Sequence, residues 1–113
     1  MTEPATPATV DQVMLGPGLT ERDRAMVVEE LRKLDRRLQR YDAGQVQLSL
    51  SVKDRDTVEQ KVTAELDVAK RRTDLIVATS TEPELRDALV EIREDLWRQL
   101  DEMIGRAVDA RRG

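Results

Sequence analysis

The stretch Val46-Gln47-Leu48-Ser49-Leu50-Ser51-Val52 decides the fold, because aliphatic and polar residues alternate through it without interruption. Strict alternation is typical of a β-strand that buries one face and exposes the other. A second alternating stretch, residues 58–68, follows the charged segment 53–57, and a third strand is expected at residues 73–80. The short connections predict antiparallel pairing, because a parallel crossover needs about a dozen residues.

A stretch in which apolar residues have helical spacing precedes these strands. Apolar residues recur every three or four positions, which predicts a helix over about residues 21–41. The apolar face of this helix consists of Val27, Leu31, Leu34 and Leu38. Thr20 is placed to cap the helix, after a break at Gly16-Pro17-Gly18. Residues 10–15, before that break, are predicted to form a short first strand.

A second helical period follows the strands. Its apolar stripe runs from Leu85 through Leu100 to Ala107 and predicts a helix over about residues 82–104. Thr81 and Glu84 form a capping-box pattern at its start. The buried face of the sheet needs a partner layer, which two amphipathic helices can supply. The sequence therefore predicts an α+β fold of order β-α-β-β-β-α, with two helices packed on one face of a four-stranded sheet.

The length of the chain favours a single domain, since 113 residues suit one hydrophobic core. We assign this domain to residues 10–104. Residues 1–9 are rich in Thr, Pro and Ala and are expected to form a disordered leader, and residues 105–113 a flexible tail. No apolar run approaches the roughly 20 residues that span a bilayer, and no signal peptide is recognisable, so a cytoplasmic protein without membrane contact is expected.

The residue types that the chain lacks limit its chemistry. It contains neither cysteine nor histidine, which removes thiol nucleophiles, the commonest general base and the commonest zinc ligands. Adjacent carboxylates such as Glu94 and Asp95 point about 100° apart on a helix and cannot converge on one metal ion. We therefore expect a binding protein and not an enzyme, with no catalytic residue, metal site or cofactor.

Charge is distributed unevenly between the two predicted helices. The net charge is −4, yet bases outnumber acids in the first helix and acids outnumber bases in the second. Arg32, Lys33, Arg36 and Arg40 fall opposite the apolar face of the first helix, with Arg37 beside them, and a second basic cluster is Lys70-Arg71-Arg72. Both groups are candidate phosphate contacts. The alternative is a solvated helix surface and a charged turn that protects the sheet edge.

Three stretches of the chain can be compared with a known family. They are Leu31-Arg32-Lys33-Leu34-Asp35-Arg36, the second strand from Gln45 to Lys53, and Asp87-Ala88-Leu89-Val90 followed by Arg98-Gln99-Leu100 in the last helix. In order and spacing they resemble the ribosome hibernation promoting factor family, also called the sigma-54 modulation or ribosome-associated inhibitor family. The resemblance covers about residues 10–104 and is to the short form, which lacks the C-terminal dimerisation domain.

The resemblance implies a translation inhibitor that acts under stress or in stationary phase. Such a protein would occlude the cleft of the small ribosomal subunit that mRNA and tRNA use. Its partner would be the phosphates of 16S rRNA, contacted by Arg32, Lys33, Arg36, Arg37, Arg40, Lys70, Arg71 and Arg72. These contacts would position the protein and recognise the shape of the RNA. Contact with a ribosomal protein, and pairing of two copies through the free sheet edge, stay open.

A second interpretation is a protein-binding regulatory module of the same fold that has lost RNA affinity. Asp101 and Glu102 occupy positions where the family has basic residues, so the last helix could bind a basic ribosomal protein or a regulator. Trp97 lies off the centre of the apolar stripe and is expected to be half-buried at its edge. A double-stranded RNA-binding domain fits less well, because Glu82-Pro83-Glu84 stands where that fold needs a lysine-rich turn.

Overall fold

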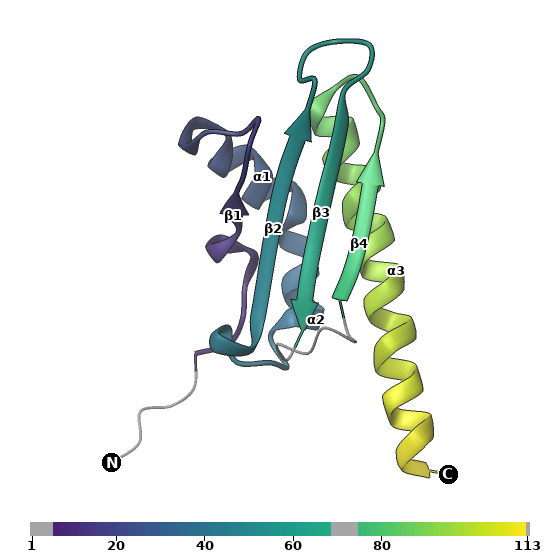
Figure 1. Cartoon of the computed structure of the whole chain (residues 1–113). Helices are drawn as coiled ribbons and strands as arrows, with labels where there is room; N and C mark the ends of the chain where they lie inside the picture. The colour runs from purple at the N-terminus through teal and green to yellow at the C-terminus, as the bar shows by residue number, and fades with distance from the viewer. Residues whose placement is uncertain (1–5, 69–74, 113) are drawn as a thin grey trace.

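A four-stranded sheet covered on one face by helices forms the body of the protein (Figure 1). The structure is a computed structural model that describes residues 6–68 and 75–112, with side chains to residue 106. The strands are β1 (Met14–Leu15), β2 (Val46–Lys53), β3 (Lys61–Val68) and β4 (Leu75–Ser80), in this order across the sheet. β1 is parallel to β2, and the three longer strands are antiparallel. The predicted α+β fold and its element order are confirmed.

The predicted first helix is a series of short helical segments. They are the 3-10 turn η2 (Glu21–Asp23), α1 (Arg24–Leu31), the 3-10 turn η3 (Arg32–Leu34) and α2 (Asp35–Leu38). The helical segment therefore ends at Leu38 and not near residue 41. Thr20 caps its start as predicted, because the Asp23 carboxylate accepts a hydrogen bond from the Thr20 N–H and completes a capping box.

The last helix, α3, begins at Leu85 and continues to Arg112, so it starts later and ends later than predicted. Thr81 is too far from Leu85 to cap it. Other side chains hold the turn before the helix, where the Ser80 hydroxyl accepts a hydrogen bond from the Glu82 N–H. The buried Gln60 amide donates to the carbonyls of Glu82 and Pro83, and thereby ties the β2–β3 connection to the start of α3.

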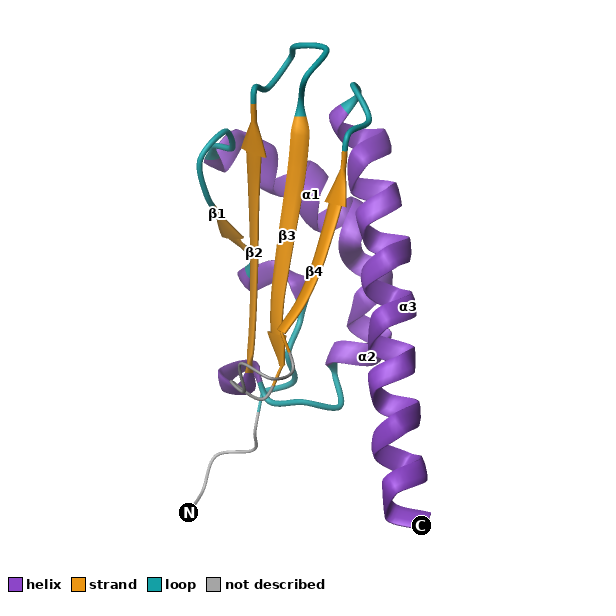
Figure 2. Ribbon diagram, turned by 45° about the vertical axis from the view of Figure 1, so that its right-hand side comes forward, coloured by secondary structure: helices purple, strands orange, loops and turns teal. Residues whose placement is uncertain are grey.

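The hydrophobic core lies between the sheet and the helices, which form two layers (Figure 2). Alternate strand residues are buried in it, including Leu48 and Leu50 of β2 and Leu66 of β3. The helical side consists of the predicted apolar faces, with Val27, Leu31, Leu34, Leu38, Leu89, Ile92, Leu96 and Leu100 all buried. The other sheet face carries the alternate polar residues, so the predicted one-sided burial is confirmed.

Two predicted strand boundaries are wrong. In the predicted strand of residues 10–15, Val10–Gln12 form a 3-10 turn and only Met14–Leu15 pair with β2. The predicted start of β3 at residue 58 is too early, because residues 54–60 form a tight loop and β3 begins at Lys61. Asp54 and Asp56 in this loop have positive φ angles, a backbone conformation that no alternation pattern predicts. Residues 73–74 of the third predicted strand lie outside the described residues.

The folded body includes residues that were assigned to the leader. Ala8 is only 2% exposed, and its N–H donates to the Tyr41 carbonyl. The Thr6 carbonyl accepts a hydrogen bond from the Ala43 N–H. Residues 6–9 therefore pack against the segment that links α2 to β2, while residues 1–5 lie outside the described residues.

Candidate nucleic-acid interface

The predicted phosphate contacts of the first helical segment lie close together on η3, on α2 and just after it. Leu34 and Leu38 are fully buried and fix this segment against the core. The basic side chains therefore occupy its outer side, where Arg32, Lys33, Arg36 and Arg40 are exposed and Arg37 is half-buried. The cations that the sequence singled out thus lie on one short segment, which we call the basic segment (residues 32–40).

Arg32 is engaged by two carboxylates. Its guanidinium donates to both oxygens of Asp11 at 3.0 Å and to Asp35 at 3.2 Å. The Arg32 guanidinium holds the pKa of the Asp11 carboxyl below its ordinary value. Because two acids surround one base, this part of the basic segment carries no excess positive charge.

Lys33 and Arg37 are engaged by α3. The Lys33 ammonium lies 3.7 Å from the Glu94 carboxylate, and the Arg37 Nε donates to Asp101 at 2.6 Å. Both cations also lie over the indole ring of Trp97, at 5.0 Å and 4.3 Å from its centroid. Trp97 is partly buried, as predicted, and contacts cations of its own chain.

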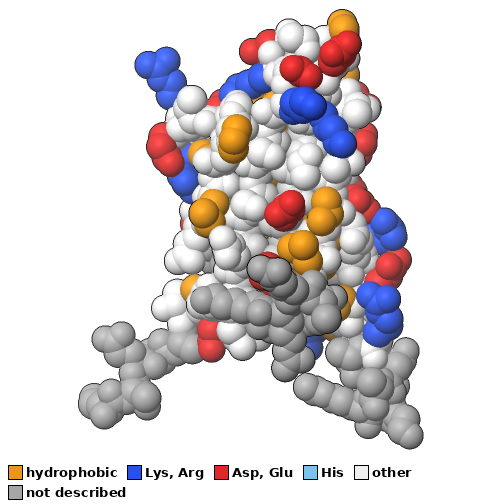
Figure 3. Space-filling model, in the orientation of Figure 1, with side chains coloured by type: hydrophobic (Ala, Val, Ile, Leu, Met, Phe, Trp, Pro, Cys, Tyr) orange, Lys and Arg blue, Asp and Glu red, His pale blue; other side chains and the backbone are white. Residues whose placement is uncertain are grey.

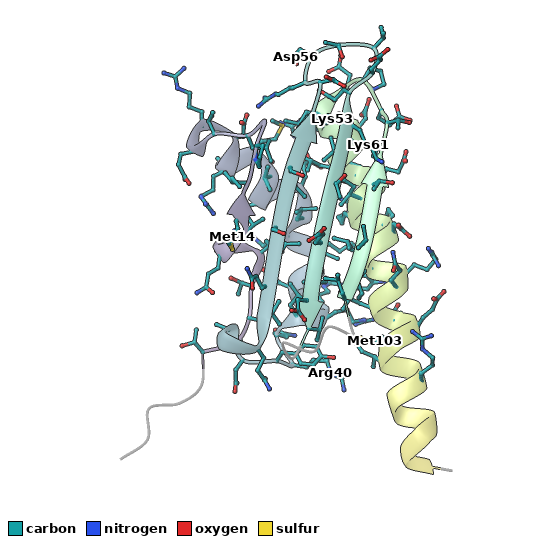
Figure 4. All side chains as sticks on the ribbon, viewed as in Figure 1. Met14, Arg40, Lys53, Asp56, Lys61 and Met103 are labelled. Atoms are coloured by element: carbon teal, nitrogen blue, oxygen red, sulfur yellow. The ribbon has the colours of Figure 1, made fainter. Side chains whose placement is uncertain are left out.

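Arg36 and Arg40 differ from their neighbours. Both side chains are exposed, and neither forms an ion pair with any residue that the structure describes. Figure 4 shows Arg40 at the end of the sheet opposite to Lys53 and Lys61. Lys70, Arg71 and Arg72 lie outside the described residues. β3 ends at Val68, which lies opposite Val46 at the start of β2.

Ion pairs connect the first helical segment to α3 in both directions. In addition to the pairs of Lys33 and Arg37, Arg86 of α3 donates to the Glu30 carboxylate of α1 at 2.6 Å. Arg93 donates to the Glu30 carbonyl at 3.1 Å. Lys33 and Arg37 of the first segment thus meet acids of α3, and Arg86 and Arg93 of α3 meet Glu30 of the first segment. The sequence shows the opposite charges, but only the structure shows that they face each other.

Two exposed lysines were missed by the sequence analysis. Lys53 and Lys61 lie directly opposite each other at the hairpin end of β2 and β3, and neither forms an ion pair within the described part of the chain. The alternation of β2 places Lys53 on the same face as Ser49 and Ser51, so the register could have identified it. Nearby Asp54 and other loop acids reduce the net positive charge at this end.

The free sheet face is mainly polar, with scattered apolar side chains (Figure 3). Met14, Leu75 and Val77 are 53%, 46% and 44% exposed. The edge strand β4 is partly covered, because the Gln99 amide of α3 donates to the Val77 carbonyl at 3.0 Å. Met14 lies on β1 and Leu75 and Val77 lie on β4, so these exposed apolar side chains sit at opposite edges of the sheet.

A shallow groove of about 690 Å³ runs along the outer side of α1. Its lining includes Val28 together with Arg24 and Arg32, which pair with Glu21 and Asp11. Among residues 6–68 and 75–112, no acidic residues are grouped so that they could hold a metal ion. No described helix combines the length and the apolar character that crossing a membrane requires.

No protein-family model and no curated protein matches this chain. The resemblance to hibernation factors therefore depends on the residues quoted above, and the structure adds the α+β fold and the placement of the cations.

Proposed function

We propose that this protein binds the RNA of the small ribosomal subunit and inhibits translation by occluding the cleft used by mRNA and tRNA. The observation that carries the proposal is the pair Arg36 and Arg40, two exposed guanidiniums four residues apart without an ion-pair partner among the described residues. Arginine binds phosphate oxygens in a bidentate manner, so two such side chains suit a phosphate backbone. The action would take place in the cytoplasm.

The shape of the protein supports occlusion as the mechanism. The body is flat, with principal extents of 47 × 36 × 22 Å and two packed layers (Figure 2). A rigid two-layer body fills a cleft without any chemical step. Contacts between arginines and phosphates would hold it in place and recognise RNA shape rather than sequence.

The ion pairs divide the predicted phosphate contacts into two groups, those without and those with a carboxylate partner. Arg36 and Arg40 are ready to bind phosphate, whereas Arg32, Lys33 and Arg37 must first leave their carboxylate partners. We propose Arg36 and Arg40 as the primary contacts and Arg32, Lys33 and Arg37 as secondary ones. Lys70, Arg71 and Arg72 keep their proposed role on the strength of the sequence alone.

The experiment that tests this proposal compares two double variants. Arg36→Gln with Arg40→Gln should weaken binding to purified small subunits about 10- to 100-fold and reduce the slope of log K against log salt by roughly 1.4 to 1.8. Arg22→Gln with Arg106→Gln is the matched control, because these arginines are also exposed and unpaired among the described residues. Equal losses in both variants would contradict the proposed site.

A second candidate function is a protein-binding regulatory module of the same fold. It is favoured by the acids that already pair with Arg32, Lys33 and Arg37, which leave less charge for RNA. Binding to the small subunit with little salt dependence, unchanged in the variant of Arg36 and Arg40, would support this candidate.

A further inference from the structure

We infer that Glu94 and Asp101 of α3 mask Lys33 and Arg37, so that α3 restrains the RNA affinity of the basic segment. The inference rests on the proposed function for the identity of the ligand, RNA phosphate, and describes the regulation of that same site. The sequence predicts that Lys33 and Arg37 contact phosphate, whereas in the structure each of them pairs with a carboxylate of α3.

The two masking carboxylates, Glu94 and Asp101, offer the cations the same kind of anionic oxygen as the phosphate that they would exclude. A carboxylate presents two anionic oxygens to a guanidinium, as a phosphate does. Asp101 accepts from the Arg37 Nε at 2.6 Å, and Glu94 lies 3.7 Å from the Lys33 ammonium. A phosphate that approached either cation would take the place of the carboxylate and would compete with it directly.

Packing keeps the competing carboxylates in position. Leu96 and Leu100 of α3 are fully buried, so the helix that bears Glu94 and Asp101 is fixed to the core. Trp97 lies beneath both cations and favours the positions in which they meet the two acids. The mask is therefore present before any ligand arrives.

The mask is weak enough to be displaced. The side chains of Lys33 and Glu94 are 45% and 51% exposed, and those of Arg37 and Asp101 are 37% and 44% exposed. Ion pairs with this much solvent contact are only weakly stabilising and are screened by salt. A surface with densely spaced phosphates would displace both acids, whereas a ligand with few phosphates would not. The mask would thus favour folded ribosomal RNA over short single strands.

The test removes the masking charges and measures RNA binding. Glu94→Gln with Asp101→Asn should bind a short RNA duplex about 2- to 30-fold more tightly than the matched control. The control is Asp87→Asn with Glu91→Gln, which removes two exposed α3 acids that pair with no described cation. It corrects for the general effect of a more positive protein.

A double-mutant cycle tests the specific partners. Glu94 also accepts a hydrogen bond from Arg93 at 3.0 Å, but Arg93 stays engaged by Glu30 when Glu94 is replaced. In a background of Lys33→Gln with Arg37→Gln, the gain from Glu94→Gln with Asp101→Asn should therefore fall to the level of the control, because neither of the two masked cations is present. The indole N–H signal of Trp97 in NMR spectra should shift in the same direction on unmasking and on addition of RNA. A gain that persists in the cycle background would overturn the inference.

The outcomes separate the mask from the proposed function. If the unmasked variant binds the RNA duplex more tightly but neither it nor the native chain binds small subunits, the mask stands and the proposed function fails. If subunits bind but the unmasked variant equals the control on subunits and duplex, the proposed function stands and the mask fails. Absence of RNA binding in every variant would overturn both.

Discussion

The ion pair between Asp23 and Arg55 offers a quantitative test of how the fold is stabilised. Arg55, in the loop after β2, donates to the two Asp23 oxygens at 2.8 and 2.9 Å and to the Gly18 carbonyl at 2.9 Å. Asp23 also accepts from the Thr20 N–H, and its side chain is only 11% exposed. The Arg55 guanidinium, aided by Thr20, lowers the pKa of Asp23 from 3.8 to about 2. The pair thus connects the hairpin loop to the start of the first helical segment.

The substitution Asp23→Asn should lower the free energy of unfolding by about 2 kcal/mol at pH 7. A depression from 3.8 to about 2 corresponds to nearly two pKa units, at about 1.4 kcal/mol for each unit. Because both partners are largely shielded from water, only a small discount for solvent screening applies.

The loss caused by Asp23→Asn should depend on pH in one direction. The pKa of Asp23 is lower in the folded state than in the unfolded state, so its stabilisation is complete above pH 3.8 and is lost as the pH falls through about 2. Linkage predicts that about half of the difference between the native chain and the variant persists at pH 3. Very little of it should persist at pH 2.

Urea denaturation at pH 7, 5, 4 and 3 measures these differences, with Asp11→Asn as the control. Asp11 also pairs with an arginine, but both side chains of that pair are exposed to solvent. A much smaller change in the free energy of unfolding is therefore expected for Asp11→Asn. A difference for Asp23→Asn that stays constant from pH 7 to pH 3, or one no larger than that of the control, would refute the reasoning.

Three further predictions concern stability, and denaturation in urea at pH 7 measures each of them. Gln60→Ala should cost about 2 kcal/mol, because the carbonyls of Glu82 and Pro83 and the N–H of Asp56 would lose a buried partner; a change below about 0.5 kcal/mol would contradict that role. Gly18→Ala should destabilise by more than about 1 kcal/mol, since Gly18 has a φ of +87° and an added Cβ would lie 2.1 Å from the Val52 carbonyl oxygen. Gly44→Ala, with open space around it, should change little, and equal effects of the two glycine variants would count against the reasoning. Leu66→Ala at the centre of β3 should cost about 2–5 kcal/mol through the cavity that it leaves, whereas Val58→Ala at the exposed loop should be nearly neutral.

Local periodicity explains why much of the fold could be predicted. Leu48, Leu50 and Leu66 alternate with polar neighbours and are buried, and Leu31 and Leu96 lie on helical stripes that face the same core. Both patterns arise from neighbouring residues in the chain, so they can be recognised without knowledge of the tertiary structure.

Features that depend on contacts between distant residues could not be predicted in this way. Gln60 is polar and yet 1% exposed, because backbone carbonyls at the start of α3 require a buried donor. The positive φ values of Asp54 and Asp56 set the length of the β2–β3 loop without a glycine to reveal it. These features follow from the packed structure and not from the local pattern.

The candidate site shows the same division between local and long-range information. The sequence placed Arg36 and Arg40 on the outer side of a helical segment, and the structure confirms that they are exposed. It could not reveal that Arg37 meets Asp101, a residue 64 positions away. The opposite charges of the two helical segments were visible, but their pairing required knowledge of how the helices lie together.

Co-sedimentation of the native protein with purified small ribosomal subunits, at low and at moderate salt, tests the proposed function most directly. The proposal predicts that the protein pellets with the subunits at low salt and is progressively released as salt rises, because arginine–phosphate contacts would hold it there. Absence of co-sedimentation at low salt would contradict the proposal that this protein binds the small ribosomal subunit.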